Sequence, residues 1–205
     1  MKVNGIILAA GLSSRMKLFK PLLKLNEKTI IENTIDSMFN SGVNKVVVVL
    51  GYRGKELEDF LYSKYNKLYL TCIYNHRYVE TDMLTSIKIG ISALDKCDAF
   101  YILPGDMPAI NTRTFTTVKE IMMDSKAMIS FPTINGHRKH PPLISWELRS
   151  YIINFNSNGG LRELWKLFEN EIVEVKVDDL GCMMDADTKE DYNKIINYIK
   201  KYKIS

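Results

Sequence analysis

The sequence predicts an α/β fold with a mostly parallel β-sheet, and three observations carry this prediction. Short apolar runs alternate along the chain with segments in which apolar residues recur at helical spacing. The 205 residues are 46% hydrophobic and 25% charged, as in an ordinary globular protein, which excludes a disordered chain. No linker, repeat or low-complexity tract interrupts the alternation, so a single domain over residues 1–205 is expected. Such alternation gives βαβ units with right-handed crossovers and helices on both faces of the sheet.

The first half of the chain begins with an expected buried strand, the apolar run at residues 3–9. Ile31, Ile35 and Met38 then recur at the spacing of one helix face. Residues 45–50 are apolar and mainly β-branched after the first residue, which predicts a strand buried on both faces. The remaining elements of this half are a helix with Leu57, Phe60 and Leu61 inward, a strand at residues 69–73, and a helix with the apolar stripe Leu84, Ile87, Ile91 and Leu94.

The second half continues the alternation with a strand at residues 98–103 that ends at Pro104. The later elements are helices around residues 115–122, 146–153 and 161–168, strands at 127–131 and 172–177, a weaker extended segment at 143–145, and a final helix around 192–199. Ligands of parallel sheets bind outside the carboxyl ends of the strands. We therefore expect the functional site just after Ala9, Ile73 and Leu103.

The net charge indicates the class of ligand to expect, and the cysteine content indicates the cellular compartment. Lys and Arg number 28 against 24 for Asp and Glu, a net charge of +4 that suits a small anionic ligand. We expect neither nucleic acid nor a membrane as a partner, because no dense basic tract and no apolar run of spanning length is present. Cys72, Cys97 and Cys182 show no zinc or redox spacing, and no secretory signal is visible, so a cytoplasmic protein with reduced thiols is expected.

The loop after the first strand has the composition of a phosphate-binding loop. Its small residues, around Gly11, let the backbone approach a ligand closely, and successive N–H groups can face an anion. Arg15 and Lys20 add two cations suited to a polyphosphate. The loop contains neither the GxGxxG nor the GxxxxGK[ST] pattern, which disfavours a dinucleotide fold and excludes a P-loop. The alternative is a small-residue turn with two solvated cations.

Acidic residues form a second candidate feature. Asp106 follows the strand at residues 98–103, where a carboxylate is placed to bind Mg²⁺ together with phosphate oxygens and water. The alternative is a Gly-Asp turn that caps a helix. Near the carboxyl terminus, Asp187 or Thr188 can serve as the N-cap of the final helix, and Asp82 can serve as that of an earlier helix.

The run at residues 135–144 combines basic residues with prolines that stiffen the backbone. Within it, His140 is a candidate for binding the phosphate of a second substrate. Gly159 and Gly160 precede a helix and form another plausible anion site. A flexible turn before an amphipathic helix is the alternative for these glycines.

The segments LAAGLSSRM, residues 8–16, and KPLL, residues 20–23, together resemble the signature of the MobA-like nucleotidyltransferases. Within that superfamily they are most similar to the molybdenum cofactor cytidylyltransferase branch. The resemblance implies a Rossmann-like three-layer domain that binds a nucleoside triphosphate. It also implies that Arg15 and Lys20 hold the triphosphate. The sequence departs from the family pattern at Lys17, where the family often has Gly. The backbone positions implied to hold the base and ribose are Leu8, Ala9, Ala10 and Gly11.

Further segments match the family in the same order along the chain. GDMP, residues 105–108, resembles the family segment whose aspartate binds the catalytic metal, which corresponds to Asp106. DADTKED, residues 185–191, resembles its acidic tail. Asp187 then matches the second carboxylate of the metal site, with Asp185 as the alternative.

Two segments resemble the acceptor region, and one resembles the loop that flanks the base. GHRKHP, residues 136–141, implies that Arg138 and His140 contact the acceptor, and Lys139 stands where the family has Gly. GGLR, residues 159–162, implies that Gly159 and Gly160 lie near the acceptor pocket. DMLTSI, residues 82–87, implies that Thr85 and Ser86 flank the base, with Asp82 in place of Gly.

The resemblance implies a transfer of CMP from CTP, or of another nucleotide, to phosphorylated molybdopterin with release of pyrophosphate and with Mg²⁺ as cofactor. Lys20, Arg15 and Asp106 are the expected catalytic residues. A molybdenum hydroxylase apoenzyme is an expected protein partner. The alternatives are transfer to a sugar phosphate or an alcohol phosphate, and a nucleotide-binding maturation factor without catalysis.

Overall fold

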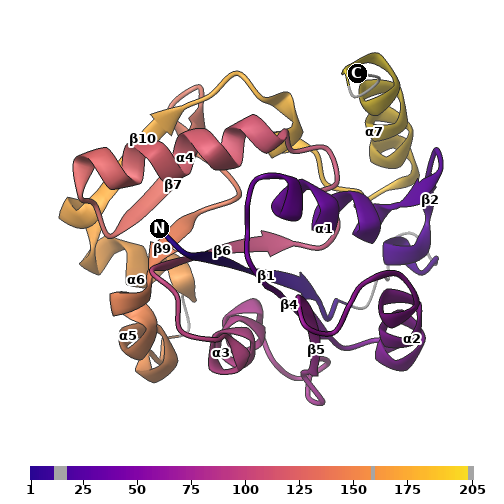
Figure 1. Ribbon diagram of the computed structural model, residues 1–205, viewed down its shortest axis with the longest axis horizontal. Helices are drawn as coiled ribbons and strands as arrows, with labels where there is room; N and C mark the ends of the chain where they lie inside the picture. Colours follow the sequence, from indigo (N-terminus) through magenta and orange to yellow (C-terminus); the bar gives the residue numbers. More distant parts are fainter. Residues whose placement is uncertain (12–17, 158–159, 203–205) are drawn as a thin grey trace.

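The computed structural model describes residues 1–11, 18–157 and 160–202. Arg15, Lys17 and Gly159 lie outside the described residues. The described part contains a central sheet with the strand order β10-β7-β9-β6-β1-β4-β5, in which β8 also pairs with β7 (Figure 1). The strands are β1 Val3–Ala9, β4 Val46–Leu50, β5 Leu70–Tyr74, β6 Ala99–Pro104, β7 Ile129–Ile134, β8 His137–Arg138, β9 Leu143–Ser145 and β10 Ile172–Lys176.

The sheet is mostly parallel, as the sequence predicts. Strand β1 pairs in parallel with both β4 and β6, so that Ile7 lies opposite Val48 and Leu103. Only β8 and β9 run antiparallel to their neighbours in the described sheet. The carboxyl ends of β1, β4 and β6 therefore meet at one edge.

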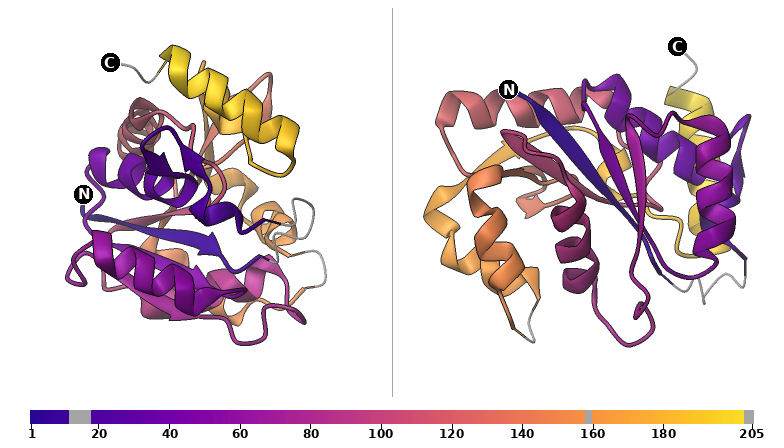
Figure 2. Two further views of the ribbon diagram at one scale, coloured as in Figure 1. Left: turned by 90° about the vertical axis from the view of Figure 1, so that its right-hand side faces the viewer. Right: turned by 60° about the horizontal axis from the view of Figure 1, so that its bottom comes forward.

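Helices cover both faces of this sheet and complete a three-layer α/β fold (Figure 2). They are α1 Ile30–Asn40, α2 Gly54–Lys64, α3 Met83–Ala93, α4 Thr112–Ser125, α5 Arg149–Asn154, α6 Leu161–Leu167 and α7 Lys189–Tyr202. Alternate residues of β1 point to opposite faces. Ile7 belongs to a buried cluster that includes residues of α1, α2 and α4, whereas Ile6 belongs to one that includes residues of α3, α5 and α6. Both isoleucines are completely buried.

The carboxyl-terminal helix α7 packs away from the sheet, against a small hairpin made by β2 Lys24–Leu25 and β3 Lys28–Thr29. Ile195 and Ile199 of α7 share a buried cluster with Leu25 and Ile30. This packing carries the segment before α7 across the molecule to the carboxyl end of β6, where Ala186 N–H donates to the Asp106 carbonyl.

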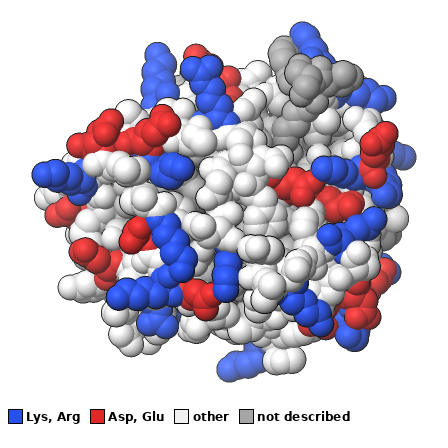
Figure 3. All heavy atoms as spheres, viewed as in Figure 1, with Lys and Arg blue, Asp and Glu red and all other residues white. Residues whose placement is uncertain are grey.

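Charged side chains are interspersed over the face seen in Figure 3, as expected for a net charge of +4. No helix within the described ranges combines the length and apolar content that crossing a membrane requires.

Candidate active site

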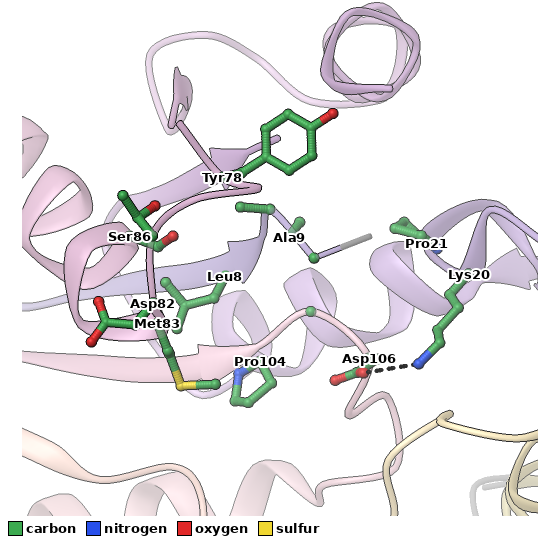
Figure 4. A pocket seen from close by; sticks show the side chains of 14 residues that line it. Leu8, Ala9, Lys20, Pro21, Tyr78, Asp82, Met83, Ser86, Pro104 and Asp106 are labelled. Atoms are coloured by element: carbon green, nitrogen blue, oxygen red, sulfur yellow. Dashed lines mark ion pairs between the residues drawn. The ribbon is translucent and has the colours of Figure 1, made fainter. Parts of the chain in front are cut away.

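A cavity of about 280 Å³ opens at the carboxyl ends of β1 and β6, where the sequence places the site (Figure 4). The predicted positions Leu8, Ala9, Ala10 and Gly11 line it. Tyr78 lies on its wall beyond the end of β5. The cavity therefore lies at the edge of the sheet where the sequence places a site, after Ala9, Ile73 and Leu103. The other lining residues are Lys20, Pro21, Thr81, Asp82, Met83, Ser86, Pro104, Gly105 and Asp106.

Glycine is required where neighbouring backbones close around this cavity. A Cβ atom on Gly51 would lie 2.5 Å from the Ala10 carbonyl oxygen and 2.8 Å from Cγ of Tyr78. A Cβ atom on Gly105 would lie 3.1 Å from the Leu8 carbonyl oxygen, which accepts a 2.9 Å hydrogen bond from Gly105 N–H. The backbone after β1 is therefore held tightly between the ends of β4 and β6.

Lys20 supplies the positive charge at one end of the cavity. It begins a short 3₁₀ helix, Lys20–Leu22, with Pro21 directly after it, and only 8% of the residue is exposed. Its Nζ lies 2.7 Å from Asp187 Oδ1 and 3.7 Å from Asp106 Oδ2 (Figure 4 marks the latter pair). The lysine thus bridges the two aspartates that sequence resemblance assigns to the metal site.

A hydrogen bond to α1 fixes the turn that carries Asp106, and the surroundings of the carboxyl raise its pKa. The Gly105 carbonyl accepts from Thr34 Oγ1 at 3.3 Å, which ties this turn to α1. Burial raises the pKa of the Asp106 carboxyl, the Lys20 charge acts against that rise, and Asp185 and Asp187 add to it. A positive charge placed at this carboxylate therefore relieves an unfavourable concentration of negative charge.

The two aspartates fit a divalent cation such as Mg²⁺. Mg²⁺ binds one or two protein carboxylates and completes its shell with phosphate oxygens and water. Asp106 and Asp187 already converge on one cation, the Lys20 ammonium. Across the described ranges, no group of three or more His, Cys, Asp or Glu side chains is arranged to hold a metal alone. The arrangement suits an ion that arrives together with phosphate oxygens.

The opposite end of the cavity is formed by α3 and the turn before it. Ser86 lies there with Met83 and Asp82, apart from Lys20 and Asp106 (Figure 4). Asp82 caps α3, as expected, by accepting from Thr85 N–H at 3.0 Å. The hydroxyl of Thr85 also turns to this carboxylate, at 2.9 Å, and Thr85 is not among the lining residues.

Behind this wall lies Asn75, a residue that the sequence patterns do not single out. It directly follows β5 and is only 2% exposed. Its Nδ2 donates to Thr81 Oγ1 and to Ser86 Oγ, each at 3.0 Å. The available signal was a polar residue just after Ile73, at the edge where the site is expected.

A larger cavity of about 960 Å³ adjoins the first, and Met83, Pro104 and Asp106 line both. Apolar side chains form much of its wall, including Phe131 and Trp165. Asp106 therefore stands where the two cavities meet. The basic side chains on the wall of the larger cavity are Arg138, Lys139, His140, Arg162 and Lys166.

Arg138, predicted to bind an acceptor, is engaged with protein carboxylates. Its Nε donates to Glu174 at 2.8 Å and its Nη1 to Glu169 at 3.0 Å, while its guanidinium lies over the Phe131 ring. These glutamates raise the pKa of Arg138. Lys139, in contrast, has no ion pair within the described part of the chain.

His140, also predicted at the acceptor, lines the larger cavity. Burial lowers the pKa of its imidazole, so the ring is neutral at pH 7 rather than a cation. Its Nδ1 atom is buried and has no hydrogen-bond partner among the described residues. The ring is thus placed to exchange a hydrogen bond rather than a charge.

Gly160, the described member of the predicted glycine pair, has its N–H committed to the Ser157 carbonyl at 3.3 Å. Its φ of 61° lies in the left-handed region that favours glycine. It precedes α6 but does not itself line the larger cavity, whereas the next residues, Leu161 and Arg162, do.

The sequence and the fold were compared with those of known proteins. Residues 5–175 match the family described as the MobA-like NTP transferase domain. The molybdenum cofactor cytidylyltransferase of Escherichia coli (strain K12) is 28% identical over 190 residues, which cover 93% of each chain. A solved nucleotidyl transferase from Methanothermobacter thermautotrophicus has a TM-score of 0.80 at 20% identity, over 98% of this chain and 99% of that one. A protein from Mycobacterium tuberculosis in complex with manganese has a TM-score of 0.71 at 17% identity, over 96% and 99%.

Proposed function

The chain belongs to the MobA-like NTP transferase family of nucleotidyltransferases, and from this premise we propose that it transfers CMP from CTP to phosphorylated molybdopterin with Mg²⁺. The observation that carries the proposal is the position of Asp106, which lines both cavities beside Lys20. We assign residues 1–205 to one nucleotidyltransferase domain. We also propose that a molybdenum hydroxylase apoenzyme receives the product.

The smaller cavity is the proposed nucleotide site. The base lies between Leu8 and the α3 end of the wall, while Lys20 and Arg15 hold the triphosphate. Lys20 is the only lysine or arginine among the described residues that line this cavity, and it lies at one end, which supports this orientation. Gly11 also lines the cavity, and its lack of a side chain allows the backbone to approach a ligand closely.

The larger cavity is the proposed acceptor site. Its aromatic and aliphatic walls suit a flat heterocycle, and Lys139 and Arg162 suit a phosphate carried by that heterocycle. Molybdopterin combines these two properties. His140 and Arg138 complete the proposed acceptor contacts, with the Arg138 guanidinium anchored by its two glutamates.

In the proposed reaction an oxygen of the acceptor phosphate attacks the α-phosphorus of CTP. The bond from that phosphorus to the oxygen bridging the β-phosphate breaks, and pyrophosphate leaves with that oxygen. The acceptor phosphate is already ionised at neutral pH, so the protein contributes positioning and charge stabilisation. Lys20 neutralises charge on the departing pyrophosphate.

Asp106 and Asp187 would hold the Mg²⁺ ion, with Asp185 as the alternative second ligand. When bound, the ion would supply electrostatic stabilisation of the phosphate oxygens. Of these aspartates, Asp106 lines both cavities and Asp185 lines the larger one.

The test is the release of pyrophosphate by Asp106→Ala with CTP, Mg²⁺ and molybdopterin. We expect turnover to be abolished while the melting temperature changes little, because this side chain is 30% exposed and lies at the site rather than in the core. Asp124→Ala, which removes an exposed carboxylate from α4, is the matched control and should retain full activity. Retained turnover in Asp106→Ala would contradict the metal assignment.

A further inference from the structure

We propose that Asn75 is a positioning residue that assembles the base-binding end of the nucleotide cavity and aims the Ser86 hydroxyl at the base. This inference rests on the proposed nucleotide site. It concerns a residue that does not line the cavity itself but bonds to residues that do.

The Asn75 amide is held in one orientation by its neighbours. Its Oδ1 accepts from Arg77 N–H at 3.1 Å, so the oxygen faces the turn after β5. Its Nδ2 must then face the opposite way, where it donates to Thr81 and Ser86. Exchange of the amide oxygen and nitrogen would place the Nδ2 donor against the Arg77 N–H donor. It would also take away the donor that Thr81 Oγ1 and Ser86 Oγ accept from.

The backbone of Asn75 also forms a hydrogen bond with a third residue of the cavity wall, Tyr78. The Asn75 N–H donates to the Leu50 carbonyl at 2.8 Å, which fixes the end of β5 against the end of β4. Its carbonyl accepts from Tyr78 N–H at 3.3 Å, within the turn that places the Tyr78 ring at the cavity. One buried residue thus connects to Tyr78, Thr81 and Ser86.

The two hydroxyl groups that Asn75 contacts differ in whether their proton is available to a ligand. Thr81 Oγ1 accepts from Asn75 and donates its own proton to the Arg77 carbonyl at 2.8 Å. Ser86 Oγ accepts from Asn75, but its proton has no acceptor among the described residues. Because Ser86 is only 6% exposed and lines the cavity, a bound base is the available acceptor for this proton.

The consequence is a hydroxyl that presents a donor rather than a lone pair to the ligand. A carbonyl oxygen or an unprotonated ring nitrogen of a base matches such a donor. Without the Asn75 amide, the Ser86 hydroxyl would be free to rotate, and its proton could turn to the Asp82 carbonyl one helical turn earlier. Asn75 therefore contributes to base binding through Ser86.

The experiment is direct binding of CTP and of inorganic tripolyphosphate, each with Mg²⁺, to the whole protein by calorimetry. In Asn75→Ala we expect CTP to bind about three- to tenfold more weakly, as for the loss of one neutral hydrogen bond. Tripolyphosphate affinity should not change, because it occupies only the Lys20 end. A purely structural role would reduce both affinities together.

Two further variants connect the effect to Ser86. In a Ser86→Ala background, Asn75→Ala should weaken CTP binding by less than about twofold more, since the hydroxyl that it orients is gone. Asn75→Asp keeps an acceptor for Arg77 N–H but offers a carboxylate to the Ser86 proton, so it should weaken CTP binding as Asn75→Ala does.

Asn4→Ala is the matched control, because Asn4 is also a buried asparagine and its Nδ2 also donates a hydrogen bond, to the Asp95 carbonyl. Asn4 lies at the end of β1 opposite to the cavity. The Asn4→Ala substitution should lower the melting temperature but leave CTP affinity unchanged. Full additivity of the Asn75 and Ser86 effects, or equal losses of CTP and tripolyphosphate, would overturn the inference. Failure of the unaltered protein to bind any nucleoside triphosphate would instead overturn the proposed function.

Discussion

Replacing Lys20 by methionine should move metal affinity and nucleotide affinity in opposite directions. Methionine keeps much of the length of the side chain and removes its charge. In the structure that charge lies 2.7 Å from Asp187 and 3.7 Å from Asp106. Its loss frees both carboxylates for a divalent cation, but it also removes the cation proposed to hold the triphosphate.

The two distances set the size of the effect. At an effective dielectric constant of about 20, unit charges at these separations attract by ~6 and ~4.5 kcal/mol. The aspartate side chains are 33% and 30% exposed, so water screens much of this attraction, and removal of the lysine from water offsets more. We therefore use the net value of a charged hydrogen bond, about 1.5–3 kcal/mol, which corresponds to roughly 10- to 150-fold in affinity.

The assay is a titration of Mn²⁺ alone, followed by a titration of CTP at saturating Mg²⁺. In Lys20→Met we expect Mn²⁺ to bind at least about tenfold more tightly and CTP to bind at least about tenfold more weakly. Lys28→Met is the control, because it removes a lysine paired with Asp36 at 2.5 Å outside the cavities and should change neither affinity. Weaker binding of both ligands by Lys20→Met would refute competition between the lysine and the metal.

Three further predictions concern the cavity walls and the metal site. Gly51→Ala should weaken CTP binding about tenfold or more in calorimetry, because its Cβ would lie 2.5 Å from the Ala10 oxygen and 2.8 Å from the Tyr78 ring; unchanged affinity would contradict this. Lys139→Gly should raise the KM for the acceptor several-fold and leave that for CTP unchanged, and equal effects on both would remove Lys139 from the acceptor site. Burial raises the pKa of Asp106, so protonation of this carboxylate should begin to weaken Mn²⁺ binding at a higher pH than for an ordinary aspartate. Mn²⁺ titrations at a series of pH values between about 7.5 and 4.5 measure this, and a loss confined to the usual aspartate range would contradict it.

Long apolar elements follow from the sequence, whereas short polar ones depend on contacts made after folding. The bounds of β1 match the strand predicted at residues 3–9, which is mainly apolar. The hairpin β2–β3 has only two residues in each strand, too few to show a period, and its turn places Asn26 at φ 60°. Its Leu25 is buried in a cluster with Ile195 and Ile199 of α7, which lie about 170 positions away in the sequence.

Strand β7 continues beyond the predicted end at Phe131 because of the local pairing. Pro132 lacks an N–H and would usually end a strand within a sheet. Here β9 pairs with Ile129 and Ser130, and β8 pairs with Thr133 and Ile134. Pro132 lies between these two antiparallel partners, where its missing N–H breaks neither pair.

The sequence predicts the position of the site better than the state of its charges. Lys20 and Asp106 are predicted individually, and the pairing of Lys20 with Asp187, 167 positions away, follows only from the fold. Arg138 likewise stands in a basic run of the sequence, but folding places Glu169 and Glu174 against it. Composition and motifs do not predict such partners, because these partners are distant in the sequence and become neighbours only in the fold.

The central claim is tested most directly by pyrophosphate release with CTP, GTP, ATP and UTP in turn, each with Mg²⁺ and with or without molybdopterin. Choline phosphate and a sugar phosphate serve as alternative acceptors in parallel reactions. The account predicts pyrophosphate with CTP and only when molybdopterin is present. Release with another nucleotide or acceptor would contradict the proposed substrates, and no release with any pairing would contradict nucleotidyl transfer itself.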